Sequence, residues 1–158
     1  MTGNPADTYT VQRSATIAAP PQRVYDQIVD FHRWTAWSPW EDIDPAMRRE
    51  HSGPESGVGA AYAWSGNRKA GQGRMTITEA TAPSRVRIDL RFEKPFKAHN
   101  TTDFHIEPDG DGSRVTWTMT GRKTLATKVM GIVRSMDSMV GPDFEKGLAR
   151  LRTATEQP

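Results

Sequence analysis

Arg85-Val86-Arg87-Ile88-Asp89-Leu90-Arg91-Phe92 alternates charged and apolar side chains without interruption. Successive side chains of a β-strand point to opposite faces, so the four apolar residues of this stretch share one face and the four charged residues share the other. The stretch therefore predicts a strand of an antiparallel sheet whose two faces meet a core and solvent.

The surrounding region, residues 47–121, repeats this alternation in segments that are separated by turns containing Gly or Pro. Near its end, Val115, Trp117 and Met119 alternate with polar residues in the same way. The preceding Asp109-Gly110-Asp111-Gly112 predicts a tight hairpin, because glycine readily adopts the positive φ that such turns require. The spacing of the segments predicts six strands.

The regions outside these strands predict one further strand and several helices. Residues 10–19 predict a strand, and Pro20-Pro21 then begins a short helix that continues to about residue 29. Toward the C-terminus two helical apolar stripes follow, Leu125, Val129, Ile132 and Val133, then Met136, Val140, Phe144, Leu148 and Leu151. Gly141-Pro142 predicts a helix start or a kink, and we expect the chain beyond Thr153 to fray.

The predicted order is therefore strand, helix, broken helix, six strands and helix. A single antiparallel sheet of about seven strands has an apolar face to cover, and the C-terminal helix is the only segment long and apolar enough to cover it. The sequence predicts an α+β domain whose curved sheet wraps this helix. We expect a flexible tail at residues 1–8, one domain at 9–155 and a frayed end at 156–158.

The composition excludes several function classes. The 158 residues include no cysteine, which removes disulfides, thiolate metal sites and cysteine nucleophiles. No basic segment with an apolar run begins the chain and no 18-residue apolar stretch occurs, so we expect neither a signal peptide nor a membrane span and favour the cytoplasm. The formal net charge is only +2 with interspersed signs, which argues against nucleic-acid binding.

Three tryptophans, Trp34, Trp37 and Trp40, fall within seven residues of a stretch that prolines interrupt. Such large rigid groups usually become buried or grip a ligand. The stretch follows the first predicted helix, so we expect a short turn or broken helix there. Trp34 and Trp37 are predicted to anchor it against the sheet edge, and Trp40 to border the mouth of a cavity; pure packing is the alternative.

Three segments carry a resemblance to a known family: Ala18-Ala19-Pro20-Pro21-Gln22-Arg23-Val24-Tyr25, Asp30-Phe31-His32-Arg33-Trp34-Thr35-Ala36-Trp37-Ser38-Pro39-Trp40 and Gly141-Pro142-Asp143-Phe144-Glu145-Lys146-Gly147-Leu148-Ala149-Arg150-Leu151. They resemble the START-like or SRPBCC helix-grip superfamily, and in particular its bacterial polyketide cyclase/dehydrase-type branch. The resemblance spans nearly the whole chain. It implies a deep, mostly apolar cavity between the sheet and the C-terminal helix, which holds a small hydrophobic molecule such as a lipid, a quinone or a polyketide-like compound.

Alternate residues of a strand lie on the same face, so the odd or even position of a residue, its strand parity, selects the residues that are expected to face this cavity. In residues 97–107 the apolar members share one face with Asn100, which would then be a polar group that points inward. Apolar walls with a few polar groups are typical of small-molecule pockets, although each of these residues could equally pack a filled core. The candidate ligand-binding residues are Trp37, Trp40, Tyr62, Trp64, Met75, Leu90, Phe92, Asn100, Phe104, Trp117, Met119, Phe144 and Leu148.

The leading hypothesis is the binding of a small hydrophobic ligand by a monomer or homodimer, without a cofactor. The first alternative is a polyketide cyclase or dehydratase that uses Tyr62, Asn100 or Arg13 for acid–base catalysis. Arg13 shares the apolar parity of the first strand, unless a bulge turns it outward. A second alternative is an interaction module similar to the chaperone activators of this fold, which would use the basic outer face of the sheet.

The spacing of the histidines disfavours a metal site. His99 and His105 share a predicted strand face, but six residues of strand separate them by roughly 20 Å, which is too far to share an ion. His32 and His51 belong to different elements, and we expect both at the surface. The sequence therefore predicts no metal.

Overall fold

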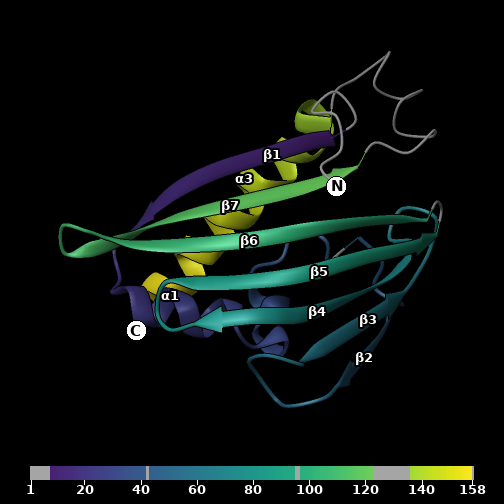
Figure 1. Cartoon of the computed structure of the whole chain (residues 1–158), viewed down its shortest axis with the longest axis horizontal. Coiled ribbons are helices and arrows are strands. Elements are labelled where there is room, and N and C mark those ends of the chain that lie inside the picture. Colours follow the sequence, from purple (N-terminus) through teal and green to yellow (C-terminus); the bar gives the residue numbers. More distant parts are fainter. Residues whose placement is uncertain (1–7, 42, 95–96, 123–135, 158) are drawn as a thin grey trace, which may run out of the picture.

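The computed structural model describes residues 8–41, 43–94, 97–122 and 136–157. Seven antiparallel strands form one curved sheet in the order β1-β7-β6-β5-β4-β3-β2 (Figure 1). The predicted α+β helix-grip architecture is confirmed, as is the hairpin at Gly110, whose φ is +58°. The strands are β1 (Thr8–Ile17), β2 (Arg48–Ser52), β3 (Ala61–Ser65), β4 (Gln72–Thr81), β5 (Arg85–Lys94), β6 (Ala98–Asp109) and β7 (Gly112–Arg122).

The helices begin and end largely where the sequence indicates. The α-helix α1 (Pro21–Ile28) begins at a proline, and the 3-10 helix η2 (Phe31–Ala36) forms the predicted broken helix. The long helix α3 (Met136–Glu156) contains Pro142 in its interior, so Gly141-Pro142 is not a helix start. The first predicted C-terminal stripe, residues 125–133, lies outside the described residues.

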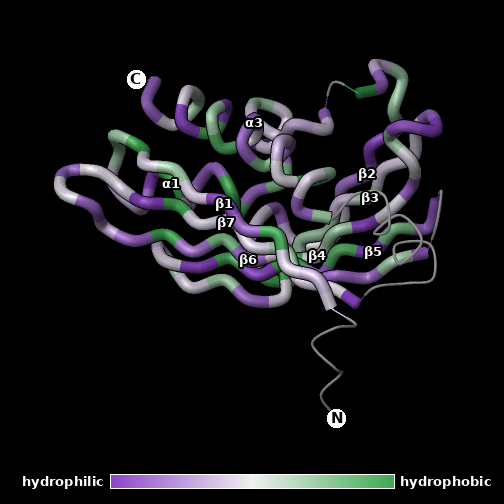
Figure 2. Tube along the Cα trace, turned by 90° about the horizontal axis from the view of Figure 1, so that it is seen from above, coloured by the Kyte–Doolittle hydropathy of each residue, from purple (hydrophilic) through white to green (hydrophobic). Residues whose placement is uncertain are grey.

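The helix α3 continues past Thr153, where fraying was expected. Thr155 is buried, and the Glu156 carboxylate accepts a hydrogen bond from the backbone N–H of Ala18 at 2.7 Å. The end of the helix is therefore held against the segment between β1 and α1. Figure 2 shows α3 lying along one side of the sheet, which we call the inner face.

Cross-strand register aligns the inner-face residues of all seven strands into rungs. One rung crosses the whole sheet without interruption, through pairs that join each strand to its neighbour. We call it the seven-strand rung, and it consists of His51, Tyr62, Met75, Leu90, Asn100, Gly121 and Tyr9. Four candidate ligand-binding residues, named from parity in four separate segments, are thus brought into one line.

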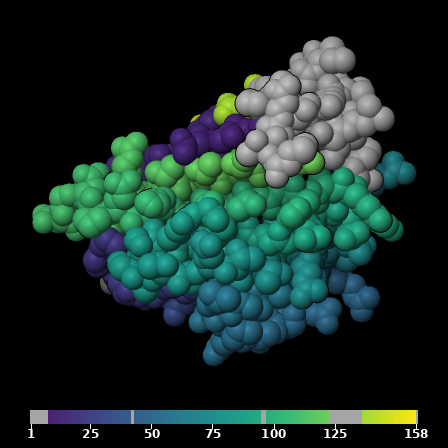
Figure 3. All heavy atoms as spheres, viewed as in Figure 1, coloured from purple at the N-terminus to yellow at the C-terminus, as the bar shows by residue number. Residues whose placement is uncertain are grey.

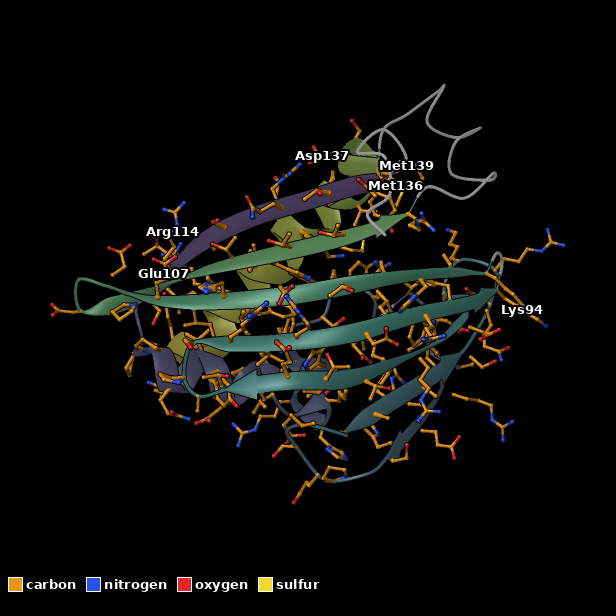
Figure 4. The ribbon with its side chains drawn as sticks, in the orientation of Figure 1. Lys94, Glu107, Arg114, Met136, Asp137 and Met139 are labelled. Atoms are coloured by element: carbon orange, nitrogen blue, oxygen red, sulfur yellow. The ribbon has the colours of Figure 1, made fainter. Side chains whose placement is uncertain are left out.

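The seven-strand rung marks a boundary in the packing of the inner face. On the side of the β6–β7 turn, which we call the hairpin end, most apolar inner-face residues are fully buried, including Val11, Ile77, Ile88, Val86 and Phe104. On the opposite side, where β5 ends and β6 begins, apolar side chains are only partly buried. We call that side the open end; Lys94 marks it in Figure 4.

Candidate functional site

An aromatic cluster fills the space between the sheet and α3 at the hairpin end. The rings of Trp117 and Phe144 stack with centroids 4.1 Å apart, and Trp37 and Trp40 meet Trp117 edge-on. Gly147 allows this approach, because a Cβ there would lie 2.8 Å from Cζ3 of Trp117. The structure therefore gives a packing role to Trp37, Phe104, Trp117, Met119, Phe144 and Leu148, which are all buried; ligand contact by them stays a prediction.

The tryptophan stretch packs more deeply than its sequence suggests. Trp34 and Trp37 are buried and both meet Phe104 edge-on, with centroids 5.8 and 5.9 Å apart. Phe104 belongs to β6, an interior strand, so the predicted contact with the sheet edge is wrong. Both indole N–H groups donate to carbonyls of α1, Trp34 to Ile28 at 2.8 Å and Trp37 to Gln27 at 3.1 Å. These bonds fix the stretch between α1 and the sheet.

At the open end, a group of half-buried apolar side chains lines the inner face. We call this group the open-end patch, and it consists of Trp64, Met75, Leu90 and Phe92. The rings of Trp64 and Phe92 meet edge-on at 5.6 Å. Gly73 makes room between them, because a Cβ there would lie 2.5 Å from Trp64. The patch combines accessible apolar surface with a rigid aromatic arrangement.

A polar network borders this patch. The hydroxyl of Tyr62 donates to Oε1 of Glu41 at 2.9 Å, and Nε of Arg49 donates to Oε2 of the same carboxylate at 2.7 Å. Burial, and then the Glu41 charge, raise the pKa of Tyr62 well above its usual range. Tyr62 is therefore a neutral hydrogen-bond donor and a poor general base.

Sequence reasoning missed Glu41 and Arg49. Glu41 lies in a proline-broken loop, where strand parity cannot indicate a direction. Arg49 of β2 lies opposite Trp64 of β3 and shares its inner face. The alternation of β2 was therefore the signal that could have identified Arg49. A short, charged strand such as β2 shows no apolar alternation from which parity can be taken.

Asn100 faces inward, as parity predicts, and is only 4% exposed. Its Nδ2 donates to the hydroxyl of Tyr9 at 3.4 Å, while its Oδ1 has no partner. Tyr9, which the sequence did not single out, reaches Asn100 across Gly121 of β7. Burial raises the pKa of Tyr9, so its hydroxyl stays protonated.

Arg13 also points inward, and the alternative of an outward-turning bulge is wrong because the β1–β7 register is continuous. Its guanidinium does not reach the open-end patch. Instead it bonds Asp137 at 2.8 and 2.9 Å and Glu145 at 2.9 Å, both on α3. A Cβ at Gly141 would lie 2.1 Å from the guanidinium, so this glycine provides the necessary space. Arg13 therefore holds α3 to the sheet, and its role in catalysis stays a prediction.

His32 and His51 are brought together, contrary to the expectation of two separate surface histidines. Their rings stack with centroids 4.1 Å apart. The Nε2 of His51 is buried without a partner, and burial followed by the proximity of His32 lowers the pKa of His51. Within the described part of the chain, no group of three His, Cys, Asp or Glu side chains is arranged to hold a metal ion.

The outer face of the sheet, which faces the viewer in Figure 3, carries several ion pairs between neighbouring strands. Arg85 and Arg87 both bond Asp103, at 3.2 and 3.1 Å, and Arg91 and His99 both bond Asp89. One hollow of the described surface lies on this face, between β1, β7, β6 and β5. Another lies at β2, β3 and β4 and is lined by residues of both faces, including Arg49, Trp64 and Gly73 of the inner face. Among the described residues of the outer face, Arg85, Arg87 and Arg91 are thus paired with acidic side chains, whereas Arg48, Arg74 and Arg114 are exposed, so the interaction-module hypothesis stays a prediction.

Comparison with known proteins identifies the family. The family model described as "Polyketide cyclase / dehydrase and lipid transport" matches residues 8–156, so the chain belongs to this family, as its resemblance implied. No curated protein matches the chain. Among the described helices, none combines the length and apolar character needed to cross a bilayer.

Solved structures share the fold at low sequence identity. Protein CV1439 from Chromobacterium violaceum is 16% identical, with a TM-score of 0.68 and coverage of 94% of this chain and 99% of that one. The protein TTHA0849 from Thermus thermophilus is 18% identical, with a TM-score of 0.66 and coverage of 93% and 97%. The Aha1 dimer from Colwellia psychrerythraea is 17% identical, with a TM-score of 0.63 and coverage of 94% and 96%.

Proposed function

We propose that this protein binds a small hydrophobic ligand, such as a lipid, a quinone or a polyketide-like molecule, on the inner face of the sheet at its open end. The observation that carries the proposal is the open-end patch. Half-buried aromatic and aliphatic side chains offer apolar area that a ligand can remove from water. The family description, which includes lipid transport, supports the same function.

The ligand lies beside the aromatic cluster and not inside it. Trp117 and Phe144 stack face to face with no space for a ligand between their rings. Trp40 contacts both of these rings and is itself only partly buried, so it forms the inner wall of the proposed site. The expectation that Trp40 borders the mouth of a cavity stays a prediction.

Binding can be tested with native mass spectrometry of the purified protein, solvent extraction and titration with N-phenylnaphthylamine, an uncharged apolar fluorophore. The variant Met75→Asp places a charge in the open-end patch and is expected to abolish binding. Thr76→Asp, the adjacent outer-face residue of β4, is the matched control and should bind normally. Failure of the wild-type protein to bind the fluorophore or any extracted compound would contradict the proposal.

Catalysis of polyketide cyclase or dehydratase type is the second candidate. Tyr62 and Asn100 favour it because both lie on the seven-strand rung and are buried. Tyr62, as a neutral donor, would polarise a substrate carbonyl. The double variant Tyr62→Phe with Asn100→Leu should abolish turnover of a polyketide-type substrate without unfolding the protein, and unchanged turnover would exclude these roles. A cytoplasmic location, and a monomeric or homodimeric state, stay predictions.

A further inference from the structure

Asn100 carries an unsatisfied polar atom although its side chain is buried. The side chain is 4% exposed, and its amide makes one long hydrogen bond, to Tyr9. Buried polar groups in folded proteins nearly always have partners, because an unmade bond in a low-dielectric interior costs free energy. A residue with one free polar atom beside a proposed ligand site therefore indicates a partner supplied from outside the chain.

The surroundings of Asn100 are built to hold it in place. Gly121 separates Asn100 from Tyr9, and a Cβ there would lie 2.6 Å from the Tyr9 hydroxyl and 2.9 Å from Cβ of Asn100. Only glycine leaves both side chains where they are. On its other side Asn100 pairs with Leu90, which belongs to the open-end patch. The amide therefore lies directly beside the apolar surface proposed for the ligand.

The chemistry of the amide defines the group that can pair with it. As placed, Nδ2 is bonded to Tyr9 and the free atom is Oδ1, an acceptor. Rotation of the amide by 180° would exchange these roles and leave a free donor. A hydroxyl group both donates and accepts, so it satisfies Asn100 in either orientation. A ketone or ether oxygen satisfies only one orientation, and a hydrocarbon satisfies neither.

The charges near the site disfavour a carboxylate in place of this hydroxyl. The inner-face guanidinium of Arg49 is paired with Glu41 at 2.7 Å, and that of Arg13 is paired with Asp137 and Glu145. Lys94 extends away from the end of the sheet (Figure 4). On the described part of the inner face, a buried carboxylate beside Asn100 would thus find no unpaired cation, and burying an unpaired charge is costly in an apolar setting.

We propose that the ligand is an uncharged, largely apolar alcohol or phenol whose hydroxyl group pairs with Asn100 beside Tyr9. The inference rests on the proposed ligand-binding function and adds the polar group that the ligand must carry. It distinguishes hydroxylated molecules from quinones, hydrocarbons and fatty acids, all of which would otherwise suit the open-end patch.

The test compares molecules that differ only at this group. Dodecanol is measured against dodecyl methyl ether, and naphthol against methoxynaphthalene, by displacement of N-phenylnaphthylamine and by titration calorimetry. The hydroxyl compound of each pair should bind about fivefold to tenfold more tightly, the effect of one hydrogen bond. The comparison is stringent, because the additional methyl group of the ether favours its binding to an apolar site.

Variants then test whether Asn100 and Tyr9 cause the preference for the hydroxyl compound. Asn100→Leu should make the two members of each pair bind equally, and Tyr9→Phe should reduce the preference, whereas Thr101→Val on the outer face of β6 should leave it unchanged. Circular dichroism checks that each variant is folded. The comparison of the two members of each pair on the wild-type protein does not depend on the variants. Equal binding of both members by the wild type would overturn the hydroxyl inference and leave ligand binding intact. If the wild type binds neither member and does not bind the fluorophore, both proposals fail.

Discussion

The two halves of the inner face are packed to different degrees. At the hairpin end, stacked and edge-on aromatic rings leave Trp117 and Phe144 at most 1% exposed. At the open end, residues of the same chemical kind, such as Trp64 and Phe92, are only partly buried. The same sheet thus uses aromatic side chains as core in one half and as accessible surface in the other. We expect that stability resides mainly in the first half, and the second half is the one proposed to bind the ligand.

The largest expected effect comes from one substitution made in both halves. Phe144→Ala should destabilise the protein by about 3–5 kcal/mol, because it removes a fully buried ring and leaves a cavity. Phe92→Ala, the same change at the open end, should cost much less and should weaken binding of the apolar fluorophore. Urea unfolding and fluorescence titration measure the two effects. Equal loss of stability in both variants would show that the halves do not differ.

A smaller effect is expected from a methyl group added at the helix–cluster contact. Gly147→Ala places a Cβ 2.8 Å from Trp117 and 2.9 Å from Pro39, so it should overpack the hairpin end and cost about 1–3 kcal/mol. Ala149→Gly serves as a comparison for the change in helix propensity, because Ala149 is an exposed residue of the same helix. A stabilised Gly147→Ala protein would mean that α3 can move away from the cluster without loss.

The indole hydrogen bonds permit a finer comparison within the hairpin end. Trp34 donates to Ile28, whereas the buried Nε1 of Trp117 has no partner. Trp34→Phe should therefore cost about 1 kcal/mol more than Trp117→Phe, because it also leaves the Ile28 carbonyl without its donor. Thermal and urea unfolding of the two variants provide the measurement; the reverse order would indicate that Trp117 has an unrecognised partner.

The smallest effect concerns pH and the histidine pair near the open end. Because the pKa of His51 is lowered in the folded protein, the unfolded chain binds more protons as the pH falls below about 6.5, and folding stability decreases. His51→Phe should flatten the pH dependence of stability between about pH 7 and pH 5. His105→Phe, at an exposed outer-face position, should preserve it. An unchanged slope in His51→Phe would exclude this contribution.

Much of the fold followed from local pattern, whereas the site followed only in part. Parity correctly oriented Tyr62, Asn100 and Arg13, because a strand determines the direction of each side chain irrespective of its partners. Parity could not tell a residue that lines a site from one that packs the core, so it grouped Trp117 with Trp64. That distinction depends on where α3 and the tryptophan stretch lie over the sheet.

The sequence alone determined the strands, the turns between them, the face on which each strand side chain lies and the long C-terminal helix. These features depend on backbone periodicity and on the special conformations of glycine and proline, which act between neighbouring residues. Only the tertiary structure decided that Glu41 bonds Tyr62, that His32 stacks on His51 and that Arg13 is paired with α3. These contacts join residues of separate elements. No local sequence pattern specifies the strand register and the helix position that bring these residues together.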